Sequence, residues 1–153
     1  MFSSNHGQIL LALKNLVLEL QPDNLHSAEV EIRSSWLYNG QPMRGISIYD
    51  AGEQEADGTI GTQDIGYLCG IVFASKDDND ARMTSDQMQE WRELIRRHLT
   101  NQRLSVTITN VTAPREHVCK MLRSGENLRH PNKYPGWSIT RMVVAVWLRE
   151  LNP

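Results

Sequence analysis

Few side chains in this sequence have a type and spacing that match known catalytic or metal-binding patterns. Its five histidines include no HExxH pair, and none lies beside a pair of cysteines: His6, His26, His98, His117 and His130. No GxxxxGK[ST] sequence occurs, no GxGxxG sequence opens a helix, and no GxSxG elbow is present. The sequence therefore predicts no cofactor, no metal ion and no catalytic residues, and we expect a protein that is not an enzyme.

Two pairs of carboxylates remain as catalytic alternatives, because side chains distant in sequence can meet in a fold. They are Glu53 with Asp57, and Glu116 with Glu126. A catalytic pair also needs a shaped pocket and perturbed pKa values, so the residue types alone do not favour catalysis.

The two cysteines, Cys69 and Cys119, each lie in an apolar run typical of a strand. Free cysteine is among the most buried residue types, and no CxxC or Cys/His ligand spacing is present. We therefore expect buried thiols in a reducing compartment rather than a disulfide or a nucleophile.

Two segments stand out by their charge. Residues 50–64 contain five acidic residues, three glycines and no basic residue, which predicts a long polar loop of the kind that often has a function. Residues 115–133 hold five Lys and Arg residues against two acidic ones, and Tyr134 and Trp137 follow. We expect a second long loop over residues 124–137.

The basic and aromatic segment has two interpretations. Basic residues interleaved with aromatic ones are typical of single-stranded nucleic-acid binding. Tyr, Trp and Arg are also enriched in the cores of protein interfaces. We favour a contact with a neighbouring chain over binding of nucleic acid.

The composition is that of a globular protein. The chain has 153 residues, of which 40% are apolar and 22% charged, and this predicts a single domain over residues 1–153 with its own core. The net charge of −2 gives no overall attraction to nucleic acid. Residues 1–6 lack a basic region, and the apolar stretch behind them contains Lys14, Asn15 and Glu19. We therefore expect neither a signal peptide nor a membrane span, and synthesis in the cytoplasm.

Hydrophobic periodicity predicts two helices, and alternation predicts the strands between them. Apolar residues recur at helical spacing over residues 9–20, behind a cap at Ser3, Ser4 or Asn5. A capping box at Thr84 precedes the second helical pattern, which runs to Leu99. The predicted strands are residues 30–36 and 44–49, joined as a hairpin by a turn at residues 39–42, then 65–75, 104–111, 117–123 and 138–150.

Strands joined by short turns pair antiparallel. The predicted fold class is therefore α+β, a mostly antiparallel sheet of about six strands with two helices packed on one face. The order of elements is α-β-β-β-α-β-β-β, and the strands at residues 65–75 and 138–150 are central because they are apolar on both faces.

This order resembles that of the tail terminator, or tail-completion, proteins of tailed bacteriophages. The resemblance covers nearly the whole chain and rests on its size, the helix at residues 84–99, the proline-containing loop at 131–135 and the closing strand at 142–149. Members of that family form a closed ring, commonly a hexamer, that ends the tail tube and faces the head connector. The resemblance implies a structural subunit of a tail or neck, assembled in the host cytoplasm and located in the virion.

The resemblance also implies partners. These are further copies of the chain in a homo-oligomeric ring, the tail tube protein and the head–tail connector proteins. DNA would pass through the lumen without sequence-specific binding, and no membrane would take part. Because ring closure joins unlike surfaces of neighbouring subunits, we predict a contact between the acidic and the basic segments, formed by Glu53, Glu55, Asp57, Arg123, Arg129, Lys133, Tyr134 and Trp137.

Two alternatives stay open at this point. The acidic segment could line the lumen instead, where negative charge keeps DNA from binding. The chain could also be a nucleic-acid- or protein-binding module that uses residues 115–137.

Overall fold

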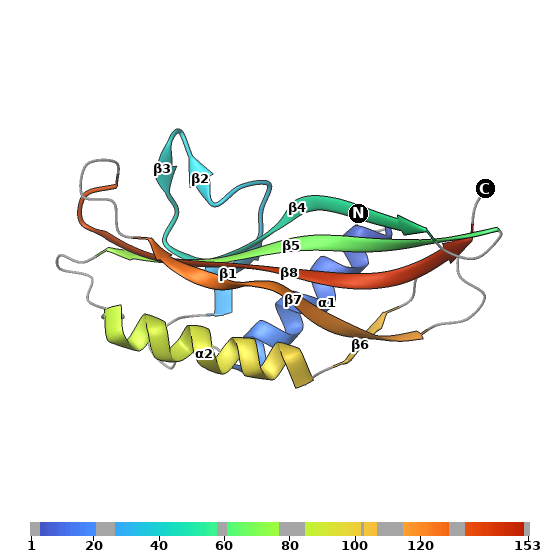
Figure 1. Ribbon diagram of the computed structural model, residues 1–153. Coiled ribbons are helices and arrows are strands. Elements are labelled where there is room, and N and C mark those ends of the chain that lie inside the picture. Colours follow the sequence, from blue (N-terminus) through green and yellow to red (C-terminus); the bar gives the residue numbers. More distant parts are fainter. Residues whose placement is uncertain are drawn as a thin grey trace.

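The computed structural model of the chain describes residues 4–20, 27–57, 61–76, 85–101, 103–106, 115–128 and 134–151. They form an elongated sheet with both α-helices on one side of it (Figure 1). The predicted α+β class, the mostly antiparallel sheet and the two helices on one face are confirmed.

The sheet has six strands in the spatial order β1-β4-β5-β8-β7-β6. Their bounds in that order are Val30–Ile32, Gly45–Asp57, Thr62–Lys76, Trp137–Leu151, Arg115–Leu128 and Arg103–Val106. All neighbours pair antiparallel except β1 and β4, which are parallel. Strands β5 and β8 pair along their whole length at the centre, as their apolar runs predict.

Helix α1 (Asn5–Glu19) begins where the sequence predicts. Ser4 is its N-cap, and the Ser4 hydroxyl accepts a hydrogen bond from the Gly7 amide at 3.0 Å. A 3-10 turn, η1 (Ser27–Glu29), leads into β1. Helix α2 (Ser85–Asn101) starts one residue after Thr84, which lies outside the described residues. Neither of these two helices is long and apolar enough to cross a membrane.

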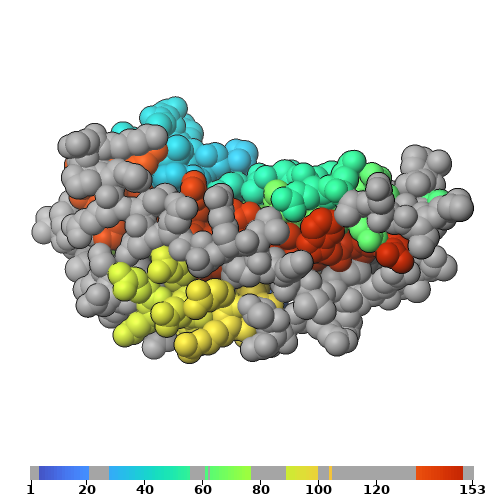
Figure 2. Space-filling view, viewed as in Figure 1, coloured from blue at the N-terminus to red at the C-terminus, as the bar shows by residue number. Residues whose placement is uncertain are grey.

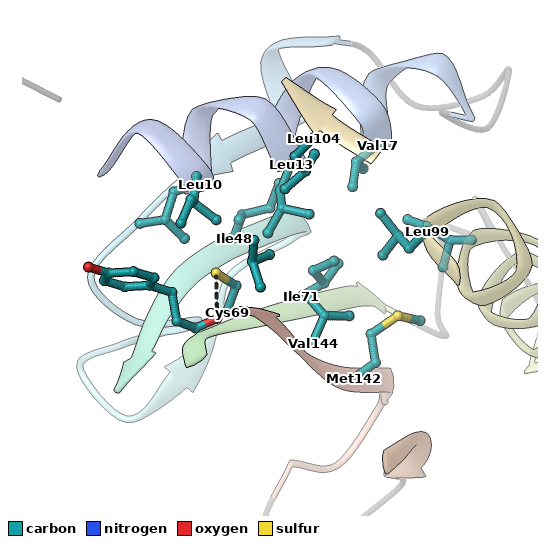
Figure 3. Close-up of a cluster of buried hydrophobic side chains, with 14 of the residues drawn as sticks. Leu10, Leu13, Val17, Ile48, Cys69, Ile71, Leu99, Leu104, Met142 and Val144 are labelled. Carbon is teal, nitrogen blue, oxygen red and sulfur yellow. Dashed lines mark hydrogen bonds between the residues drawn. The ribbon is translucent and has the colours of Figure 1, made fainter. Parts of the chain in front are cut away.

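The main core lies between the helices and the sheet. Figure 3 shows Leu10, Leu13 and Val17 of α1 above the buried side chains of the strands, with Leu99 of α2 beside them. Two contacts tie the helices together: Trp91 donates its indole N–H to the Leu20 carbonyl at 3.3 Å, and His98 lies 3.0 Å from Glu19. One face of the sheet is thus closed by a continuous apolar layer.

A smaller cluster packs on the opposite face, at one end of the sheet. Strands β2 (Leu37–Tyr38) and β3 (Gln41–Pro42) form a short hairpin that projects from this face (Figure 1). Asn39 and Gly40 both have positive φ, 52° and 76°, as the favoured two-residue hairpin turn requires. Trp36 at the base of this arm contacts Tyr134 edge to face, with ring centroids 5.5 Å apart.

The predicted hairpin between residues 30–36 and 44–49 is wrong. Val30 is paired with Ile46 and Ile32 with Ile48 in a parallel ladder. The turn signal at Asn39 and Gly40 is real, but it belongs to the β2–β3 arm. That arm lengthens the connection enough for the chain to return to the starting end of β1, which a parallel pair requires.

The predicted loop at residues 50–64 is also wrong. Most of this segment forms the distal part of a long hairpin, in which β4 pairs with β5 as far as Asp57 with Gln63. The segment is polar because it is an exposed edge strand, and not because it lacks strand structure. The second predicted loop, residues 124–137, is shorter than expected, because residues 124–128 belong to β7 and Trp137 begins β8. Residues 107–111 of the predicted strand 104–111 lie outside the described ranges.

Candidate interaction surface

Strand β4 is divided by a β-bulge. Asp50 is paired with Cys69 and Gly52 with Leu68, so Ala51 is an extra residue that has no pairing partner on β5. Gly52 has φ of +102°, a conformation that side chains disfavour. The bulge separates residues 45–50, which the core holds, from residues 51–57.

Side chains satisfy the backbone groups at this bulge. The Gly52 amide donates to Asp50 Oδ1 at 2.7 Å, and the Leu68 carbonyl accepts from His6 Nε2 at 2.9 Å. His6 Nδ1 lies 3.4 Å from Asp50 Oδ2. These contacts fix the first turn of α1 to the bulge, since a buried carbonyl without a donor is costly.

His6, Cys69 and Asp50 together resemble the side-chain set of a cysteine nucleophile with its base. Cys69 Sγ lies 3.7 Å from His6 Nε2. That nitrogen, however, must carry the proton it donates to the Leu68 carbonyl, so it has no lone pair to accept one from the thiol. Cys69 is outside any disulfide and has none of its surface exposed, as predicted for it, and His6 offers its thiol no proton acceptor in this arrangement.

Residues 51–57 of β4 form an acidic edge. Strand β1 covers β4 only at residues 46–48, and no other described strand lies on that side. Glu53 and Glu55 are exposed, and neither has an ion-pair partner among the residues that the structure describes. Figure 2 shows this part of β4 on the surface, above β8 in red. The side chain of Asp57 lies outside the described set, although its backbone ends the strand.

Several backbone N–H and C=O groups of this edge point away from β5. The Arg33 amide donates to the Ile48 carbonyl at 2.9 Å, so Ile48 turns its polar groups away from β5. Ile48 is paired with Ile71 of β5, whose backbone N–H and C=O groups therefore also point away from β4. The same holds for every second residue of β5 from there, including Tyr67 and Ile65. Glu53 is paired with Tyr67, Glu55 with Ile65, and Asp57 with Gln63, which is the next position in this series. The three acidic residues therefore direct their backbone N–H and C=O groups outward, away from β5.

The basic strand lies on the other side of the sheet. Arg123 belongs to β7 and is paired with Val143 of β8. Among the described strands only β6 lies beyond β7, and it pairs with Arg115–Val118 alone. The predicted residues Arg129 and Lys133 lie outside the described ranges, as do the side chains of β7.

Tyr134 and Trp137 are buried within the chain, with 6% and 9% of their surface exposed. They pack with Val72, Ile139 and the base of the β2–β3 arm, and Lys76 Nζ lies 5.7 Å from the Trp137 ring centroid. In the single chain they anchor the arm, and a role for them between chains stays a prediction. Stacking on a base requires an exposed ring, so this arrangement does not favour the nucleic-acid interpretation.

Near the far end of the hairpin, an ion pair joins β5 to β8. Arg149 donates from Nε and from its terminal nitrogen to the two oxygens of Asp64, at 2.8 and 3.2 Å. These hydrogen bonds and the positive charge of Arg149 hold the pKa of Asp64 below its ordinary value. The pair borders a hollow of about 390 Å³, which Trp147 and Leu148 also line.

Aromatic rings lie over glycines on the face away from the helices. A Cβ at Gly66 would meet the Trp147 ring at 2.9 Å, and one at Gly70 would meet the Tyr49 ring at 2.2 Å. Each ring belongs to the residue directly opposite its glycine. Gly66 and Gly70 are thus places where a neighbouring aromatic ring lies close against the strand backbone.

Sequence reasoning named Glu53, Glu55 and Arg123 as interface candidates but gave no role to the contact between His6 and Asp50. Their contacts join positions more than forty residues apart, and no local pattern announces a bulge. Within the described ranges, no three His, Cys, Asp or Glu side chains gather closely enough to hold a metal ion. No protein-family model matches the chain, and a search of curated proteins gives no match either.

Proposed function

We propose that this chain is the repeating subunit of a ring that caps a phage-like tail tube and joins it to the head connector. The observation that carries the proposal is the separation of charge across one sheet. The acidic edge of β4 lies at one margin and the basic strand β7 at the other, with β5 and β8 between them.

This separation favours contact between chains. Three strand spacings of about 4.8 Å put the β4 and β7 backbones about 14 Å apart, so the two strands do not pair within one chain. A twofold dimer would bring like surfaces together, whereas a head-to-tail contact joins the acidic margin of one copy to the basic margin of the next. Repeating that contact closes a ring where the rotation from one copy to the next divides a full turn.

The place of the ring in a tail or neck is supported by the element order. A capped N-terminal helix, strands, a second helix and closing strands follow one another as in the family that the sequence resembles. The exposed carboxylates Glu53 and Glu55 lack partners among the described residues, as a surface awaiting a basic neighbour would. The acidic residues of the ring would repel DNA, in keeping with passage rather than binding.

The first test is the mass of the assembly, measured by native mass spectrometry and light scattering over a wide concentration range. We expect a closed homo-oligomer, seen as a ring by electron microscopy, and its presence in particles that contain a tail tube. A chain that stays monomeric at every concentration and is absent from such particles contradicts the proposal.

The second test reverses charge. Glu53→Lys with Glu55→Lys should weaken assembly, and adding Lys120→Glu with Arg123→Glu should restore it, because the charges are then exchanged. The matched control is Glu90→Lys with Glu93→Lys on the exposed side of α2, which makes the same change in net charge. Intact assembly of the β4 variant, or an equal loss in the control, would reject contact through the acidic edge.

A further inference from the structure

We infer that neighbouring copies join by strand addition: the outer edge of β4 at residues 51–57 pairs antiparallel with the outer edge of β7 in a second copy. This rests on the proposed ring and specifies its contact. Charge alone would need only two surfaces that approach, whereas strand addition makes one continuous sheet across the subunits.

The backbone of β4 is prepared for such a partner. Glu53, Glu55 and Asp57 direct their N–H and C=O groups outward, and no described strand takes them up. Main-chain hydrogen bonds to an exposed sheet edge are a recurring mode of recognition. The bulge and the acidic side chains exclude indiscriminate pairing, since charge on an edge strand opposes aggregation.

Strand direction and length favour β7 as the occupant. Each of the three steps from β4 to β7 is antiparallel, so β7 runs opposite to β4. Placing a second copy beside the first in the same orientation therefore brings β7 antiparallel to β4. Outside the parts that β1 and β6 cover, β4 offers residues 51–57 and β7 offers the longer segment 119–128, which is long enough to pair with the whole of this edge.

The short outer strands do not obstruct this pairing. With Arg123 of one copy opposite Gln54 of the next, Leu128 falls beside residue 49, just past the part of β4 that β1 covers. The part of β7 that β6 covers, Arg115–Val118, falls beyond the end of β4 at Asp57. Strands β1 and β6 therefore lie at opposite ends of the new strand pair.

The two edges carry opposite charge, acidic at Glu53, Glu55 and Asp57 and basic at Lys120 and Arg123. With Arg123 opposite Gln54, the irregularity between Met121 and Arg123 puts Lys120 opposite Ala56, and these two positions lie on the face of the sheet opposite to that of Glu53, Glu55 and Asp57. The charges therefore attract across the edge without forming direct cross-strand pairs, whereas like charges directly opposite one another destabilise a strand pair. In the reversed arrangement, with two β4 edges together, glutamates would meet glutamates.

A disulfide tests the register directly. Paired strands hold opposite Cα atoms about 4.5–5.5 Å apart, which suits a disulfide. Gln54→Cys with Arg123→Cys, in a Cys119→Ser background, should give a covalent ladder of multimers under mild oxidation, which a reductant reverses. The control is Tyr38→Cys with Arg123→Cys, since Tyr38 is 69% exposed on the β2–β3 arm and should give no ladder.

A backbone test separates strand addition from charge. Glu55→Pro removes an outward N–H while leaving the bonds to β5, as proline does on an edge strand. We expect association to weaken about tenfold or more, because a hydrogen bond is lost and the approaching strand is displaced. Glu55→Gln, which removes the charge and keeps the N–H, should weaken it by about fivefold or less at low salt. Unchanged thermal unfolding of the isolated chain shows that Glu55→Pro still folds.

The outcomes separate this inference from the proposed function. If the wild-type chain assembles, but the Gln54/Arg123 pair gives no ladder and Glu55→Pro assembles normally, strand addition is wrong and the ring stands. If the wild-type chain forms no oligomer, both are wrong. A ladder together with loss of assembly in Glu55→Pro supports both.

Discussion

Strand β4 is paired with β5 along nearly its whole length, yet its two halves differ in burial, charge and neighbours. Residues 45–50 place Ile46 and Ile48 in the main core and gain β1 as a second partner. Among the strands that the structure describes, only β5 pairs with residues 51–57, which expose Glu53 and Glu55. Backbone pairing thus continues past the point where side-chain burial stops, so the distal half is held in place while no described strand covers its outer edge.

The largest expected effect is on the proximal half. Ile48→Ala should lower the free energy of unfolding by about 2–5 kcal/mol, because Ile48 is fully buried and its removal leaves a cavity. Gln54→Ala in the exposed distal half should change it by about 0.5 kcal/mol or less. Urea denaturation measures both, and similar losses for the two variants would abolish the distinction between the halves.

The junction between the halves should respond next. His6→Ala should cost about 1–3 kcal/mol, because it removes the donor to the Leu68 carbonyl and leaves a partly buried acceptor without that bond. His98→Ala is the control, since the partner of His98 within the described ranges is the exposed Glu19 carboxylate, and the substitution should cost about 1 kcal/mol or less. A cost for His6→Ala no greater than that of the control would show that the bulge does not depend on α1.

The backbone of the bulge gives a smaller effect. Gly52→Ala should cost about 1–2 kcal/mol, since the added Cβ meets no described residue within 4 Å other than its chain neighbours and the positive φ is unfavourable. Gly52→Asn should cost less, because Asn tolerates positive φ better than other residues with a side chain. Thermal unfolding compares them, and equal stability of the alanine variant and wild type would mean that the bulge relaxes.

The smallest effect is expected at the distal end, and it depends on pH. Because Arg149 lowers the pKa of Asp64 in the folded chain, the ion pair stabilises the fold above the ordinary carboxyl pKa of 3.8. That contribution is lost as the pH falls through the lower folded pKa. Asp64→Asn should therefore be slightly less stable than wild type at neutral pH and equally stable in acid. A difference that persists in acid would point to a role other than the ion pair.

The sequence predicted the elements that obey one periodicity. Helix α1 with its cap at Ser4, helix α2, and the central strands β5 and β8 all appear close to their predicted bounds. The prediction failed where one local pattern is compatible with two structures. The turn at Asn39 and Gly40 marks a hairpin, but nothing local says which strands that hairpin joins.

The candidate surface was predictable in its residues and not in its form. The acidic composition of residues 50–64 pointed to Glu53 and Glu55, but an exposed edge strand and a loop share that composition. The pairing of His6 with the bulge depends on how α1 crosses the sheet, which is a tertiary property. Tyr134 and Trp137 show the converse, because residues typical of interfaces are also those that fill a small cluster within one chain.

Residues 51–57 of β4 and residues 119–128 of β7 are offset from each other along the strand direction, and this offset has a geometric consequence. Their middles, Gln54 and Arg123, fall in rows that cross β8 at Trp147 and Val143. These β8 positions are four residues apart by number (147 − 143), or about 13 Å at about 3.3 Å per residue. A repeat of four strands is about 19 Å wide, so copies joined at these edges would incline their strands by roughly 35° to the ring axis. Closed β-barrels tilt their strands by about 35–45°, so a wall built from such copies would have the strand tilt of a closed barrel.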